Sequence, residues 1–101
     1  MRVLLSIDTS SNKEVVVEIE IDGKKNILQR PLDTRKAQAV LPMIEELLKK
    51  HKLELKDISE IKVNPGPGSF TGVRVGVTIA NTLGFLLKIP VNGKETAEPV
   101  Y

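Results

Sequence analysis

Residues 64–76 read "NPGPGSFTGVRVG" and separate two different kinds of sequence. The preceding residues 60–63, "EIKV", are typical of a short strand, and residues 70–87 have the apolar spacing of a helix. The glycines and prolines at 65–68 predict a sharp turn, and Ser69 is a good N-cap for the next helix. The stretch therefore predicts a strand–turn–helix unit, the building block of parallel α/β sheets.

The residues before this unit have the pattern of an antiparallel meander. Residues 2–8 form an apolar run that predicts a strand buried on both faces, and residues 14–21 alternate as a half-buried strand does. Asp22-Gly23 supplies the positive φ angles of a two-residue hairpin turn. We therefore expect residues 26–32 to return as a third strand.

Between the meander and the turn the period changes. Apolar residues recur at helical spacing from about Thr34 to about His51, and Pro42 is expected to kink this helix or confine its regular part to the residues after Pro42. The remaining predictions are a turn at 55–58, a short strand at 89–91 and an irregular segment at 92–101. The order β-β-β-α-β-α-β describes a mixed five-stranded α/β sheet of ribonuclease-H-like arrangement, although other mixed sheets share this pattern.

The composition limits the function. A chain of 101 residues is one small domain, and the absence of cysteine excludes thiolate metal sites and cysteine nucleophiles. His51 is the one histidine, so we expect no metal site and no catalytic triad. The dispersed lysines and the aromatic content of 3% argue against a nucleic-acid surface. No signal peptide and no apolar run of about 18 residues are recognised, so we expect a cytoplasmic protein and no membrane partner.

The predicted second helix has a ridge of small residues. They recur every four positions and leave one side of the helix nearly bare: Gly72, Gly76, Ala80 and Gly84. Each interior glycine costs the helix about 1 kcal/mol relative to alanine, so something must approach closely. Two alternatives remain open: the ridge packs on this chain's own first helix or sheet, or it accepts helices from another chain.

The turn itself offers little chemistry. A Walker-type phosphate loop needs Lys followed by Ser or Thr after the last glycine, and Phe70-Thr71 stands there instead. The N–H groups of residues 70–72 could hold an anion, or the turn residues could simply shape and cap the helix start. The residues concerned are Gly66, Gly68, Ser69 and Thr71.

Asp8, Thr9 and Ser10 at the end of the first strand form a second candidate site. They have no glycine that would let a phosphate approach the backbone, and Asp8 lacks the further carboxylates that a nuclease metal site needs. We interpret Asp8 as a turn or hydrogen-bonding residue. The alternative is a stand-alone nucleotide-binding hydrolase or phosphotransferase that uses the glycine-rich loop together with Asp8. A direct tRNA-binding module is a third hypothesis.

Three segments resemble the TsaB (YeaZ) family: "IDTSS" at 7–11, "AVLPMIEELL" at 39–48 and "GPGSFTGVRVGVTIANTLGFLLKIPV" at 66–91. The run from Gly66 to Gly76 is highly specific, and the resemblance covers essentially the whole chain. The family is the non-catalytic subunit of the bacterial machinery that makes threonylcarbamoyladenosine (t6A) beside the tRNA anticodon.

The resemblance implies a half-domain of the actin and Hsp70 superfamily, without a cofactor or catalytic residues. It also implies pairing with and activation of the catalytic subunit TsaD through helices 36–50 and 70–87, with a TsaE-like ATPase in the complex. We expect a homodimer when the chain is alone, and only indirect or weak contact with tRNA. The expected interface residues are Val40, Met43, Ile44, Leu47, Gly72, Val73, Gly76, Val77, Ala80 and Gly84.

The sequence departs from the family pattern in two respects. Lys36 and Ala37 replace the usual His-Ser, and Val40 replaces a leucine. Family members also normally have a second domain of similar size. We therefore expect residues 1–101 to be a single TsaB-like N-terminal domain without the usual second one, a naturally minimal form rather than a fragment.

Overall fold

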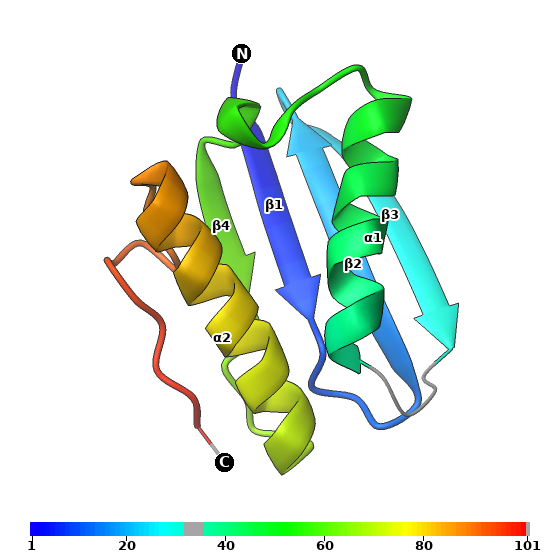
Figure 1. Ribbon diagram of the computed structural model, residues 1–101, viewed down its shortest axis with the longest axis vertical. Coiled ribbons are helices and arrows are strands. Elements are labelled where there is room, and N and C mark those ends of the chain that lie inside the picture. Colours follow the sequence, from blue (N-terminus) through cyan, green and yellow to red (C-terminus); the bar gives the residue numbers. More distant parts are fainter. Residues whose placement is uncertain (32–35, 101) are drawn as a thin grey trace.

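The computed structural model describes residues 1–31 and 36–100. It contains four strands, two helices and one turn of 3-10 helix (Figure 1): β1 (Val3–Asp8), β2 (Glu14–Ile21), β3 (Lys24–Pro31), α1 (Lys36–Lys50), η1 (Leu55–Asp57), β4 (Glu60–Val63) and α2 (Phe70–Leu87). The strand order is β3-β2-β1-β4, with β1 parallel to β4 and antiparallel to β2. The mixed α/β prediction is therefore confirmed.

The β2–β3 hairpin follows from the sequence of its turn. Asp22 and Gly23 both have positive φ angles, 48° and 89°, as a two-residue hairpin turn requires. Because the turn is this short, β3 begins at Lys24, two residues earlier than predicted. The pairing register sets Val17 opposite Leu28 on the face toward the helices and Glu20 opposite Lys25 on the other face.

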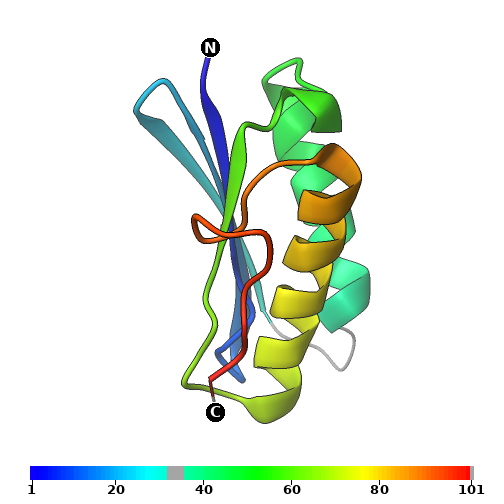
Figure 2. The ribbon, with the colours of Figure 1, turned by 90° about the vertical axis from the view of Figure 1, so that its left-hand side faces the viewer.

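Both helices cover the same face of the sheet (Figure 2). Strand β1 directs Val3, Leu5 and Ile7 into the core beneath them, whereas Ser6 and Asp8 are only half-buried on the other face. Leu4 is buried on that other face. The prediction of a strand buried on both faces therefore holds at Leu4 and fails at Ser6 and Asp8, because within the described residues no helix covers the far side (Figure 2).

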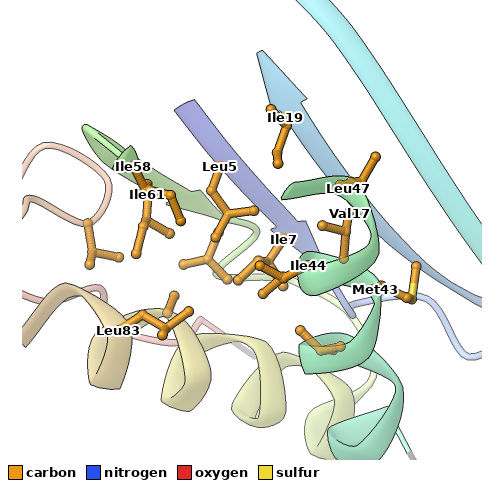
Figure 3. Close-up of a cluster of buried hydrophobic side chains, with 14 of the residues drawn as sticks. Leu5, Ile7, Val17, Ile19, Met43, Ile44, Leu47, Ile58, Ile61 and Leu83 are labelled. Carbon is orange, nitrogen blue, oxygen red and sulfur yellow. The ribbon is translucent and has the colours of Figure 1, made fainter. Parts of the chain in front are cut away.

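The core is aliphatic, as the scarcity of aromatic residues dictates. Leu5, Val17 and Ile19 from the sheet meet Ile44 from α1 and Leu83 from α2 (Figure 3). Helix α1 begins at Lys36, so it includes Pro42 rather than starting after it. Pro42 is tolerated on the exposed side of the helix, while Met43 and Ile44 point inward.

The expected fifth strand is reduced to a single bridge. Val91 pairs with Ile61 in parallel, through Ile61 N–H to the Pro90 carbonyl (3.0 Å) and Asn92 N–H to the Ile61 carbonyl (2.9 Å). The backbone then turns away at Asn92, which has a φ of 52°. The prediction of a strand over 89–91 is wrong because this turn ends the pairing after one residue.

The Asn92 side chain continues the ladder where the backbone leaves it. Its Oδ1 accepts a hydrogen bond from Val63 N–H (2.9 Å), and its Nδ2 donates to the Val63 carbonyl (3.0 Å). One side-chain amide thus satisfies both backbone groups that a further strand residue would pair.

The sequence analysis recognised no apolar run of about 18 residues, and helix α2 corrects that expectation. It has 18 residues and is long and apolar enough, by length and composition alone, to cross a bilayer. Its residues Gly76, Val77 and Ala80 are buried against the rest of the protein. We therefore describe α2 as a helix that packs on the sheet with one side, where seven of its 18 residues are buried.

The role of Asn92 can be tested by substitution. We expect Asn92→Ala to lower the free energy of unfolding by about 1–3 kcal/mol, because two backbone groups of Val63 lose their partners and alanine disfavours a positive φ. Asn92→Gly loses the same two hydrogen bonds but tolerates the positive φ, so comparing it with Asn92→Ala separates the two contributions. Urea denaturation followed by circular dichroism measures both. Equal stability of both variants and the wild type would contradict the role of the amide.

Candidate functional site

The turn at 64–69 is held tightly by other parts of the chain. Gly66 has a φ of 106°, and a Cβ on it would collide with the Val100 carbonyl oxygen. Gly68 lies against Ser10, and Ser69 N–H donates to the Ser10 carbonyl (2.8 Å). The glycines are therefore needed for close approach between segments of this chain.

Ser69 caps α2 as predicted. Its Oγ accepts a hydrogen bond from Gly72 N–H (3.3 Å), and its carbonyl accepts one from Val73 N–H (2.8 Å). The cap predicted at Ser69 is therefore present. An anion at this helix end would have to do without Gly72 N–H, since Ser69 already uses it, while Thr71 is exposed on the first turn.

Asp8 is bound by the turn in which it lies. Its Oδ1 accepts from Ser10 N–H (2.9 Å) and Ser10 Oγ–H (2.6 Å), and its Oδ2 accepts from Asn64 Nδ2 (3.2 Å). Asn64 Oδ1 in turn accepts from Gly66 N–H (3.0 Å). Asp8 and Asn64 therefore tie the carboxyl ends of β1 and β4 to the glycine-rich turn.

This polar cluster borders a shallow pocket on the uncovered face of the sheet. The pocket measures about 300 Å³ and is lined by Ser6, Ile7, Asp8, Val16, Glu18, Lys62, Val63 and Asn64. Sequence reasoning missed Asn64. The signal was its position directly after a strand parallel to β1, because the carboxyl ends of adjacent parallel strands meet at one edge.

Thr9 has a different role from its two neighbours. It is fully buried, and its Oγ1 donates to the Gly72 carbonyl of α2 (2.5 Å). A Cβ on Gly76 would collide with the same Oγ1 and would lie 3.4 Å from a methyl group of Val63. Thr9 therefore sets the distance between α2 and the sheet.

The ridge of small residues faces the chain's own sheet. Ala80 is fully buried, and a Cβ on Gly84 would collide with Val91 Cγ2. The first of the two alternatives for the ridge is thus confirmed. All ten expected interface residues are buried within the chain: Val40, Met43, Ile44, Leu47, Gly72, Val73, Gly76, Val77, Ala80 and Gly84. The exposed side chains of α1 and α2 lie on the other sides of these helices.

We call those side chains the outer face. It consists of Leu41 on α1 and Phe70, Arg74, Val75, Thr78, Ile79, Phe85 and Leu86 on α2. Phe85 is 80% exposed and Leu86 66%, although both are large apolar residues. A shallow pocket of about 350 Å³ lies among Thr71, Arg74, Val75, Thr78 and Ile79. The outer face could have been inferred from the sequence, because it lies opposite the ridge on the helix.

Comparison with known proteins identifies the family of this chain. The family model described as "TsaD: tRNA N6-adenosine threonylcarbamoyltransferase" matches residues 31–98, about two thirds of the chain. The chain belongs to this TsaD family. Within it, the curated relatives include proteins named tRNA threonylcarbamoyladenosine biosynthesis protein TsaB. The resemblance to TsaB (YeaZ) proteins is therefore confirmed.

Three such relatives match most of this chain. TsaB of Buchnera aphidicola subsp. Schizaphis graminum is 35% identical over 93% of this chain and 44% of its own length. TsaB of Escherichia coli strain K12 is 34% identical over 92% and 40%, and that of Bacillus subtilis strain 168 is 34% identical over 94% and 42%. The chain thus spans less than half the length of the curated relatives it matches.

A solved structure confirms the family fold. YeaZ from Pseudomonas aeruginosa superimposes with a TM-score of 0.84 at 33% identity, covering 90% of this chain and 42% of that one. The resemblance to TsaB (YeaZ) proteins therefore rests on sequence and on structure alike.

The contact between Thr9 and Gly76 yields a test. We expect Gly76→Ala to destabilise the fold by about 1–3 kcal/mol, because its methyl group would collide with Thr9 Oγ1. In a Thr9→Ala background the same change should cost clearly less, since the colliding oxygen is gone. Thermal and urea unfolding of the four variants give the coupling energy. Strict additivity of the two substitutions would contradict the contact.

Proposed function

We propose that the chain is a non-catalytic subunit of the bacterial machinery that makes t6A in tRNA, and that it pairs with and activates a TsaD-type catalytic subunit. The family assignment and the names of the relatives support this. Because the chain spans less than half of those relatives, their whole-protein role is carried to it only as this proposal. The observation that carries the pairing is the exposed apolar surface of the outer face.

The outer face is apolar enough to be a surface that another protein covers. Of the eight large apolar residues that are exposed in the described chain, four lie on α1 and α2: Leu41, Phe70, Phe85 and Leu86. Val75 and Ile79, both partly exposed, continue this surface between them along α2. Exposed apolar side chains gathered on one side of a helix are typical of contact with another protein, and aromatic residues are enriched in such contacts.

The polar groups support a binding role over a catalytic one. Both carboxylate oxygens of Asp8 accept hydrogen bonds from Ser10 or Asn64, so they serve the turn. His51 follows the C-terminal end of α1, at the end of the sheet opposite the one where Asp8 terminates β1 (Figure 1). Asp8 and His51 are therefore too far apart to act together as a catalytic pair. We therefore assign the chemistry of the modification to the partner.

The rest of the proposal follows from the family. The chain acts in the bacterial cytoplasm, a TsaE-like ATPase joins the pair, and contact with tRNA is indirect or weak. The outer face also serves a homodimer when the TsaD-type subunit is absent. The half-domain has a ribonuclease-H-like origin, which its mixed sheet with two helices supports.

The outer face can be tested with one matched pair of variants. We expect Leu86→Glu to prevent pairing with the TsaD-type protein of the same genome, because it places a charge in the apolar contact. Ile27→Glu is the control, since Ile27 is a similarly exposed apolar residue on β3. Size-exclusion chromatography of the co-expressed proteins measures pairing, and circular dichroism checks folding. Loss of pairing in both variants, or in neither, would count against this surface.

The function itself is tested by complementation. We expect the chain, co-expressed with the TsaD-type protein, to restore t6A to tRNA in cells depleted of their own TsaB, and the Leu86→Glu variant to fail. Mass spectrometry of nucleosides from purified tRNA measures the modification. Pairing without any restoration of t6A would refute the activating role while leaving the interface in place.

A further inference from the structure

We propose that Arg74 selects the partner of the outer face, which must place a carboxylate against the Arg74 guanidinium. This inference rests on the proposed function and specifies the chemistry of the partner's contact surface. It concerns a residue that the interface predicted from the sequence did not include.

Arg74 is the one charged residue among the 18 of α2. Its guanidinium lies over the ring of Phe70, with the central carbon 5.4 Å from the ring centroid. Within the described chain the other two arginines, Arg2 and Arg30, form ion pairs with Glu60 and Glu46. Among the same residues, no carboxylate pairs with Arg74.

The position of Arg74 means that a partner covering it must supply the missing negative charge. Its side chain lines the shallow pocket with Val75 and Ile79, so a partner that covers the outer face also takes water from the guanidinium. An arginine does not lose its proton in a protein, and burying its charge without a partner strongly disfavours a complex. A stable partner must therefore supply an anion at this point.

A protein carboxylate fits this point better than a phosphate polymer or a lipid surface does. Nucleic acid and anionic membranes are held by several cations acting together. The outer face contains Arg74 alone, among apolar residues and Thr78. One stacked guanidinium in apolar surroundings matches one acidic side chain, which it can bind through two parallel hydrogen bonds.

The same reasoning separates a different partner from a second copy of this chain. Helix α2 has no acidic residue, so a second α2 cannot neutralise Arg74. The acidic residues of α1 are Glu45 and Glu46, of which Glu46 is already paired with Arg30, so Glu45 is the one further carboxylate that these two helices of a second copy could offer. A homodimer that packs α2 against α2 therefore leaves Arg74 without a carboxylate. Arg74 should therefore favour a partner with an acidic contact residue over self-association through α2.

The test measures pairing and self-association with the same variants. We expect Arg74→Glu to weaken binding to the TsaD-type protein by at least about tenfold, Arg74→Gln to weaken it less, and Arg74→Lys to lie between Arg74→Gln and the wild type. Lys13→Glu makes the same charge change on an exposed loop and is the control. Calorimetry at low and high salt should show a shallower salt dependence for Arg74→Gln.

Self-association should respond in the opposite direction. Arg74→Gln removes an uncompensated charge from a pair of identical surfaces, so sedimentation equilibrium should show self-association that is unchanged or tighter. A variant that merely damaged the helix would weaken both kinds of pairing. Weakening of both to the same degree would therefore overturn the inference.

The remaining outcomes separate this inference from the proposed function. Unchanged affinity and salt dependence of Arg74→Glu toward the TsaD-type protein would overturn the role of Arg74 and leave the proposed function standing. Absence of any pairing by the wild type would overturn both. Cosedimentation with phosphatidylcholine–phosphatidylserine vesicles that depends on Arg74, with protein pairing independent of it, would assign Arg74 to a membrane and overturn the proposal.

Discussion

The close approach of α2 to the end of β1 determines the rest of the structure. Thr9 Oγ1 binds the Gly72 carbonyl, and the space next to it accommodates only the hydrogen of Gly76. This contact fixes the rotation of α2 about its own axis. With the ridge turned inward, Phe85 and Leu86 must point outward. The surface on which the proposed function depends is thus a consequence of how the opposite side of the helix packs.

The sequence predicted the fold well where local chemistry decides it. Asp22-Gly23, the alternation in β2 and the cap at Ser69 each specify one conformation, and the structure has all three. The length of the last strand depended on a backbone angle, which the spacing of apolar residues does not reveal. Residues 89–91 have the apolar pattern of a strand, but a positive φ at Asn92 ends the pairing at once.

The site was harder to predict for a related reason. Small residues every four positions show that something packs closely on a helix, and they do not show what it is. The sheet of the same chain and a helix of another chain demand the same absence of side chains. Contacts such as that of Thr9 with Gly76 distinguish the two, and this contact joins residues far apart in the sequence. Arg74 was not among the predicted interface residues because a single charged residue forms no repeating pattern in the sequence.

The amide of Asn92 has a consequence for solubility. It occupies the backbone groups of Val63 with which an incoming strand of another molecule would pair, so β4 offers no free ladder at that point. The opposite border of the sheet is protected by other means, since β3 carries Lys24, Lys25 and Arg30 and ends in Pro31. Strand-by-strand polymerisation is therefore discouraged at both borders. The protein can expose an apolar helical surface without also inviting amyloid-like growth.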